Sequence, residues 1–112
     1  MFAVIFEVQP HNNKAGDYLE LAAHLRPELE KIDGFISVER FESISQKGKY
    51  VSISYWRDEA AVKAWRSHVE HQQAQRMGRQ EIFADYRIRV AHVIRDYGMH
   101  DRAQAPQTMP AV

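Results

Sequence analysis

Residues 33–56 of this chain are DGFISVERFESISQKGKYVSISYW, and this stretch carries the clearest secondary-structure signals of the sequence. Two runs rich in β-branched and aromatic residues, Phe35–Phe41 and Tyr50–Trp56, predict two strands. The link between them contains the polar turn Gln46–Lys49, which is typical of an antiparallel hairpin. Gly34 suits the left-handed conformation that caps the end of a helix. The stretch therefore predicts the end of a helix followed by a β-hairpin.

The residues before this stretch predict a strand and a helix. Apolar side chains recur every three or four residues over Gly16–Ile32, which is the spacing of an amphipathic helix. Pro27 lies inside it, so we expect a kink or a break near Leu25–Arg26. Phe2–Val8 alternates between two faces and predicts the first strand.

The residues after it predict a second helix, a last strand and a tail. Asp58 is a good N-cap for a helix over Glu59–Met77. Tyr86–Ile94 alternates as a long final strand. We expect residues 1–98 to form one domain, and residues 99–112 to form a tail that is mobile or wrapped on a partner subunit.

The resulting order, β-α-β-β-α-β, is the ferredoxin-like arrangement of the α+β class, with a four-stranded antiparallel sheet. Two helices cover only one face of such a sheet. The other face still carries large apolar groups, which are unusual in water for a monomer. We therefore predict a homodimer in which two sheets pack together. The alternative is a monomer in which the second face of the sheet carries a mixture of polar and apolar side chains.

The composition excludes several function classes. Acidic and basic side chains balance at 15 each, so we expect no nucleic-acid partner, which would need excess positive charge. The absence of cysteine excludes disulfides and thiolate sites and suits a reducing cytoplasm. The apolar run at the N-terminus is too short for a signal peptide or a membrane span. We expect a cytoplasmic protein without a membrane partner.

Two segments narrow the choice among the protein families that share this order of elements. Gly34–Phe41 and Ser54–Arg66 resemble the corresponding segments of the antibiotic biosynthesis monooxygenase family, whose members are dimeric α+β barrels. The similarity continues through His71–Gln75 and the last strand and covers roughly residues 2–98. It implies a cofactor-independent monooxygenase that oxidises a small aromatic or quinol-like compound with dioxygen. One alternative is a heme-binding, heme-degrading enzyme, and another is a non-catalytic dimeric module that binds a small molecule.

The heme alternative can be compared residue by residue with the family's heme-degrading type, which uses an Asn in the first strand, a Trp in the second helix and a His ten residues later. Trp65 matches, but Gln75 stands where the His is required, and Phe2–Gln9 contains no Asn. Heme would therefore need His68 or His71 as its iron ligand. These two are spaced for a metal pair, but no inward carboxylate is near, so we expect no metal site.

The middle of the second helix mixes an indole with polar side chains on one stripe. Relative to Trp65, Gln72 lies about 20° away around the helix, His68 about 60° and Gln75 about 80°, whereas His71 lies about 120° away, at the edge. Inward polar groups cost free energy unless they are paired. This pattern predicts a cavity between helix and sheet. The alternative is a fully packed apolar core in which the polar groups lie at its solvent-exposed edge.

These residues suggest roles in a reaction. His68 is the candidate base for a phenolic proton, because an imidazole titrates near neutral pH. Trp65 is the candidate platform for an aromatic substrate. A lone histidine is more often structural, and the indole is equally well explained as core. The remaining candidate ligand-binding residues are Gln72, Gln75, Tyr86 and His24.

Three arginines, Arg87, Arg89 and Arg95, are expected on one face of the last strand. Glu7 and Glu39 could pair with them across the sheet. One interpretation is that an arginine stabilises an anionic substrate or a superoxide-like intermediate. The other is a salt-bridge set that fixes the register of the dimer.

Overall fold

The computed structural model describes residues 1–76 and 82–106, with the backbone alone for residues 70–76. Along the chain the elements are β1 (Phe2–Pro10), α1 (Ala15–Glu30), β2 (Phe35–Glu42), β3 (Tyr50–Trp56), α2 (Glu59–Arg76) and β4 (Phe83–His92). The predicted order β-α-β-β-α-β is confirmed. None of the described helices is long and apolar enough to cross a membrane.

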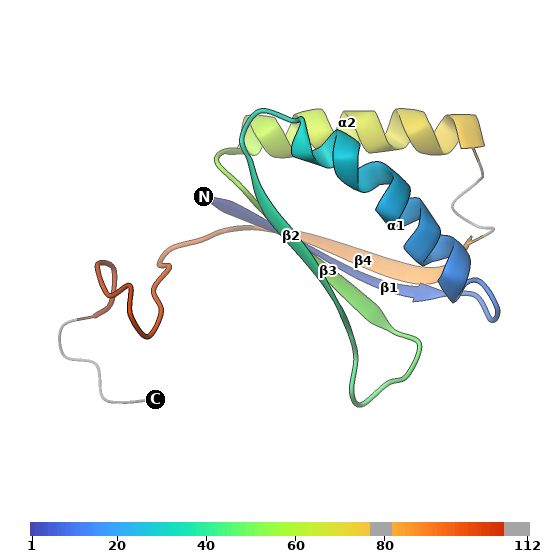
Figure 1. Cartoon of the computed structure of the whole chain (residues 1–112), viewed down its shortest axis with the longest axis horizontal. Helices are drawn as coiled ribbons and strands as arrows, with labels where there is room; N and C mark the ends of the chain where they lie inside the picture. The colour runs from blue at the N-terminus through green and yellow to red at the C-terminus, as the bar shows by residue number, and fades with distance from the viewer. Residues whose placement is uncertain (77–81, 107–112) are drawn as a thin grey trace.

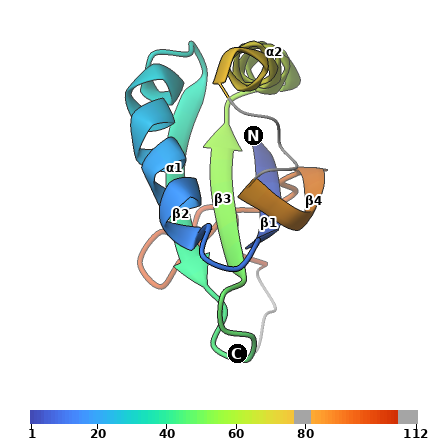
Figure 2. The same ribbon diagram turned by 90° about the vertical axis from the view of Figure 1, so that its right-hand side faces the viewer.

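The four strands form one antiparallel sheet in the order β2-β3-β1-β4. Both helices lie on the same side of it (Figure 1). Helix α1 lies beside β2, whereas α2 passes over β1 and β3, as the side view shows (Figure 2). The ferredoxin-like α+β fold is confirmed, and the edge strand β4 is left largely uncovered on the helix side.

Helix α1 does not break near Pro27, so of the two predicted outcomes, a kink or a break near Leu25–Arg26, the break is wrong. It runs as one element from Ala15 to Glu30 with the proline inside it. Leu25 and Leu29 flank the proline, and both are buried. Burial of these two leucines holds the turn in place even though the proline removes one backbone hydrogen bond.

Strand β4 is shifted toward the N-terminus relative to its prediction. It starts at Phe83, three residues before the predicted start, and ends at His92. Ile94 therefore lies beyond the sheet and is 83% exposed. Arg95 lies outside the strand for the same reason, so its predicted place on the sheet face is wrong.

The two local signals around the hairpin are confirmed. Gly34 has a φ of 95°, in the left-handed region that favours glycine. The Asp58 carboxylate accepts a hydrogen bond from the backbone N–H of Ala61 at 2.9 Å, as an N-cap does. Both signals belong to one corner, because the backbone N–H of Arg57 donates to the Gly34 carbonyl at 2.7 Å.

Two buried clusters hold the helices on the sheet. In the first, Trp56 is completely buried and packs with Leu29, Ala61 and Val62. The indole N–H of Trp56 donates to the Ser54 hydroxyl at 2.9 Å, which satisfies its one polar atom. The second cluster contains Val8, Tyr18 and Ile82. The two clusters anchor different ends of the helical layer.

Residues 93–106 leave the sheet and run away from the helices (Figure 1). They contact one another: the Gly98 N–H donates to the Asp101 carbonyl at 2.8 Å, and the Arg102 guanidinium lies 5.2 Å from the centre of the Tyr97 ring. The prediction of a tail that is mobile or wrapped on a partner stays a prediction, and residues 107–112 lie outside the described part.

Candidate functional site

A cavity of about 450 Å³ lies between the two helices and the sheet. This volume is within the range of about 300–1,000 Å³ that is typical of small-molecule sites. The side chains along it come from α1, α2 and all four strands. The predicted hollow between the second helix and the sheet is therefore present.

The strand register builds the floor of this cavity as two parallel rows. One row crosses the sheet as Val38, Ser54, Val4 and Val90. The next row runs Arg40, Ser52, Phe6 and Ile88. Because side chains alternate between the faces of a strand, all eight point to the helix side. The second row is polar over β2 and β3 and apolar over β1 and β4.

The helices supply walls that are mostly apolar. Helix α2 contributes Trp65, whose indole stacks on the buried Trp56 with ring centres 6.3 Å apart. This contact fixes the plane of the Trp65 indole. The other apolar wall residues from the helices are Leu21, Ala22, Leu25, Leu29, Val62 and Val69. Such a site favours a flat, apolar ligand over water.

His68 lies behind Trp65 and is not among the residues that line the cavity. Its ring stacks on the indole with centres 5.7 Å apart. Its Nε2 atom is 3.5 Å from a carboxylate oxygen of Glu28 on the opposite helix. In this arrangement the imidazole connects α2 to α1 and supports the indole. Its predicted role as a base stays a prediction.

The other predicted site residues divide into three groups. Tyr86 lines the cavity. His24 is exposed on α1 and does not line it. The side chains of His71, Gln72 and Gln75 lie outside the part of the chain whose side chains the structure describes. Of the predicted residues, the structure thus brings Trp65 and Tyr86 together around one space.

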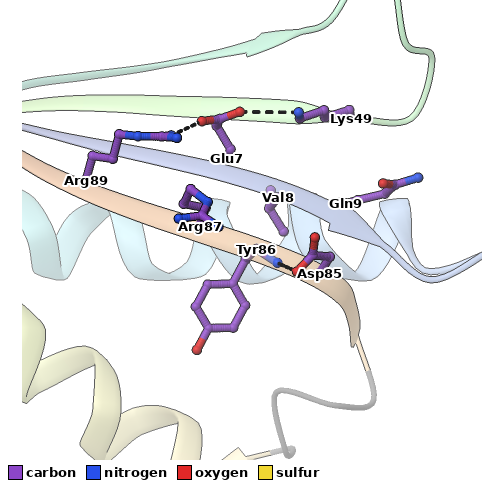
Figure 3. A pocket seen from close by; sticks show the side chains of 8 residues that line it. All are labelled: Glu7, Val8, Gln9, Lys49, Asp85, Tyr86, Arg87 and Arg89. Atoms are coloured by element: carbon purple, nitrogen blue, oxygen red, sulfur yellow. Dashed lines mark hydrogen bonds and ion pairs between the residues drawn. The ribbon is translucent and has the colours of Figure 1, made fainter.

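Figure 3 shows why Tyr86 and its neighbours on β4 have different surroundings. The Tyr86 ring points to the helix side, whereas Arg87 and Arg89 lie toward the opposite face of the sheet (Figure 3). On that face Arg89 contacts Glu7, and the Lys49 ammonium is 3.2 Å from the same carboxylate. Hydrogen bonds from Lys49 and then Arg89 hold the pKa of Glu7 below its ordinary value.

This network supports one half of the sequence prediction for the arginines. The pairing with Glu7 across the sheet is confirmed for Arg89. The pairing with Glu39 is wrong within the described residues, since no ion pair joins it to any of the three arginines. Because these arginines are on the far face or beyond the strand, none lines the cavity between helices and sheet.

The sequence prediction missed a polar pair inside the cavity, Tyr18 and Arg40. The Arg40 Nε–H donates to the Tyr18 hydroxyl at 3.0 Å, and the guanidinium carbon is 5.4 Å from the centre of the Tyr18 ring. Burial raises the pKa of the Tyr18 phenol, with Arg40 acting in the opposite direction. The one signal in the sequence is that Arg40 shares a face of the strand with Val38.

Comparison with known proteins identifies the family. Residues 1–77 match the family model described as antibiotic biosynthesis monooxygenase. The chain belongs to this family.

"Jasmonate monooxygenase ABM" of Pyricularia oryzae is 46% identical over 93 residues, which are 83% of this chain but 43% of that protein. "Uncharacterized protein YqjZ" of Bacillus subtilis is 35% identical over 94 residues, which are 84% of this chain and 80% of that protein. The chain thus spans less than half of the Pyricularia relative.

Solved structures of other proteins share the fold. MhuD from Mycobacterium tuberculosis, described as a heme-degrader with two hemes in its active site, superposes with a TM-score of 0.70 at 15% identity over 88% of this chain and 100% of that one. SnoaB from Streptomyces nogalater, described as a cofactor-independent oxygenase, gives a TM-score of 0.69 at 12% identity over 85% and 94% of the two chains. At such identities the likeness establishes the fold alone.

The described residues around the cavity offer heme iron no imidazole, thiolate or thioether ligand. Proteins hold heme iron with His, Cys, Met or Tyr. The described part of the lining contains no His, Cys or Met. The lining has two phenols: Tyr18 accepts a hydrogen bond from Arg40, and its raised pKa opposes the tyrosinate form that iron needs, whereas Tyr86 is partly exposed on β4. Within the described residues there is also no cluster of three or more His, Asp or Glu side chains that could hold a metal ion.

Proposed function

We propose that the chain is a cofactor-independent monooxygenase that binds a small aromatic, quinol-like compound between its helices and its sheet. The observation that carries the proposal is the cavity beside Trp65, which is large, mostly apolar and walled by an indole of fixed orientation. Membership of the family and the name of the Pyricularia relative support an oxygenase. The description of SnoaB supports a reaction without a cofactor.

In such a reaction the substrate supplies the electrons. For an anthrone-type compound, a CH2 group becomes C=O, one atom of dioxygen enters the product, and the other leaves as water. Loss of the first proton gives an electron-rich anion that reacts with dioxygen. The role proposed for the chain is to orient this anion against Trp65 and to exclude water, since a dry site strengthens the interactions that hold it. Tyr86 is proposed as an orienting hydroxyl at the same cavity.

Oxygen uptake with anthralin, an anthrone, tests this function. We expect the protein to accelerate uptake over a heat-denatured sample, with one dioxygen consumed per anthralin and no effect of EDTA. Trp65→Ala should lower the rate by about tenfold or more, because it removes the platform, whereas Trp65→Phe retains a flat ring and most of the rate. Absence of accelerated uptake across a panel of anthrones and quinols would instead favour the non-catalytic binding module.

The role of His68 can be separated from that of Trp65 by a pH profile. If His68 is the base, the rate of oxygen uptake rises with pH as the imidazole loses its proton, and His68→Gln would abolish that rise. A residue that only supports the indole would leave the shape of the profile unchanged while lowering the rate at every pH. The contact with Glu28 and the absence of His68 from the lining support the second outcome.

Titration with hemin tests the alternative cofactor. We expect no Soret shift, because the described lining offers no imidazole or thiolate to iron. A shift that is lost in His68→Ala or His71→Ala would contradict the proposal and favour the heme enzyme.

We further propose that the chain acts as a homodimer in the cytoplasm. The apolar side chains on the far face of the sheet support the dimer, and the cysteine-free sequence supports a reducing compartment.

A further inference from the structure

The cavity carries an excess of positive charge that the whole chain does not. Acidic and basic residues balance over the sequence at 15 each. The described residues that line the cavity include Arg26, Arg40 and Arg66 but no Asp or Glu. The three arginines come from α1, β2 and α2, so they reach the same space from three sides.

Arg40 is the arginine that is fixed in place. It is half-buried on the floor, with its Nε–H donated to the Tyr18 hydroxyl and its guanidinium carbon 5.4 Å from the centre of the Tyr18 ring. Within the described residues no carboxylate pairs with it. A guanidinium has five N–H donors, so the four on its two terminal nitrogens are left for another acceptor.

Tyr18 does not neutralise this charge. Burial raises the pKa of its phenol, so the hydroxyl stays protonated at neutral pH and is a neutral partner. A half-buried cation without a counter-ion is costly in an apolar site unless a ligand supplies the negative charge. Arg26 and Arg66 are exposed on the two helices and make no ion pair within the described residues, so their charges add to the attraction.

We propose that the ligand of this cavity is an apolar molecule with a carboxylate head, and that Arg40 binds that head. The planar fork of a guanidinium matches a carboxylate through two parallel hydrogen bonds. The floor fixes the orientation: the head lies over β2 and β3, beside Arg40 and Ser52, and the apolar body extends over β1 and β4 toward Ile88 and Val90. This inference rests on the site of the proposed function and names the substrate class of that site.

Calorimetric titration with 2-naphthoate and its methyl ester tests the inference without any reaction. The two probes share the ring system and differ in charge. We expect the acid to bind about tenfold or more tightly than the ester. Only the acid can accept a charged hydrogen bond from Arg40, and such a bond accounts for a difference in affinity of this size. The preference should shrink as NaCl is raised from 20 to 500 mM, because salt screens the exposed Arg26 and Arg66.

Two variants assign the preference to Arg40. Arg40→Gln should abolish the preference for the acid, whereas Tyr18→Phe should keep it. Both remove the hydrogen bond between the two side chains, but only the first removes the charge. If Arg40→Gln fails to fold, Arg40→Lys serves instead, since it keeps the charge without the fork and should retain only part of the preference.

The inference is overturned if the wild-type protein binds the acid no more tightly than the ester, including the case in which neither binds. It is also overturned if Arg40→Gln keeps the full preference. These results are independent of oxygen uptake: a protein that prefers 2-naphthoate but oxidises no anthrone or quinol contradicts the proposed function alone, and the reverse result contradicts the carboxylate head alone.

Discussion

At the scale of single residues, Gly34 shows how one position joins the hairpin to the second helix. Its φ of 95° is a conformation that L-residues rarely adopt. A Cβ atom built there would lie 2.7 Å from the Cβ of Ala61 on α2. The glycine is therefore required both by the backbone and by the close approach of the helix. Gly48 has a similar φ of 87°, but a Cβ there would meet nothing within 4 Å.

We predict that Gly34→Ala destabilises the protein more than Gly48→Ala does. The left-handed backbone alone costs about 1–3 kcal/mol for a residue with a Cβ, and both variants share this cost. Only the first also pushes α2 away through Ala61. Urea unfolding followed by circular dichroism measures the free energy of unfolding of both variants. Equal losses in the two variants would mean that the close approach of α2 contributes nothing.

Also at this scale, the sequence predicted Trp65 and Tyr86 at a cavity but missed Arg40. The side chains that share a face of the second helix could be predicted, because the 3.6-residue period of a helix determines them. Arg40 was overlooked because β2 alternates too weakly to tell its inner from its outer face in sequence. His68 lies on the predicted stripe, yet the contact with Glu28 on α1 turns it toward the other helix. Such a contact between distant residues has no sequence signal.

At the scale of elements, an exposed charge cluster joins the end of α1 to the start of α2. The Arg57 guanidinium donates to Asp33 at 2.9 Å and to Asp58 at 3.1 Å. Asp58 in turn caps α2 through the backbone N–H of Ala61. The hydrogen bonds from Arg57 lower the pKa of Asp33, and the bonds from Ala61 and then Arg57 lower the pKa of Asp58.

These shifts predict that stability falls in acid. A carboxyl group whose pKa is lower in the folded protein contributes stability above its ordinary pKa, here 3.8, and loses it as the pH drops through the lowered value. We expect the urea midpoint to fall as the pH drops below the ordinary pKa of these carboxyl groups. In Arg57→Gln the fall should be shallower, because both carboxyl groups return toward their ordinary pKa. An unchanged slope in that variant would contradict the role of this cluster.

The cap itself can be tested at neutral pH. We predict that Asp58→Ala lowers the melting temperature and that Asp58→Asn restores part of the loss, since an amide oxygen still accepts the Ala61 N–H. The two variants lose the same contact with the Arg57 charge, so their difference isolates the cap. Identical melting temperatures for the alanine and asparagine variants would show that the cap is not what Asp58 contributes.

At this scale the sequence predicted every element and most of their bounds. The hairpin could be predicted because its strands are short and clearly bounded by turn residues. Of the kink or break predicted at Pro27, the break is wrong, because burial of Leu25 and Leu29 outweighs a local preference. The start of β4 was missed because pairing with β1, which sets it at Phe83, is a long-range contact.

In the whole molecule, both helices lie on one side of the sheet, and no described helix covers the other face (Figure 1). On that face Ile5 and Ile53 lie opposite each other on the two central strands. Phe41 is 43% exposed on β2, and Ile94 and Met99 in the tail are more than 80% exposed. This much apolar surface supports the proposed dimer.

We predict that Ile53→Lys converts a dimer to a monomer, because it puts a further charge, without a carboxylate partner of its own, beside Ile5 on the two central strands of the far face. Ile44→Lys is the matched control, since Ile44 is fully exposed in the hairpin loop and should leave the dimer intact. Analytical ultracentrifugation measures the oligomeric state of both variants and of the wild-type protein. A wild-type chain that sediments as a monomer, or an Ile53→Lys variant that remains a dimer, would contradict sheet-to-sheet packing.

The space between the helices and the sheet is the proposed functional site, and a variant that fills this space tests the proposal. Ala22 lines the cavity on α1, whereas its neighbour Ala23 is exposed and does not. We predict that Ala22→Phe abolishes 2-naphthoate binding in calorimetry, while Ala23→Phe binds as the wild type does and both variants unfold cooperatively. Undiminished binding by Ala22→Phe would contradict the proposal, because the ligand would then lie elsewhere.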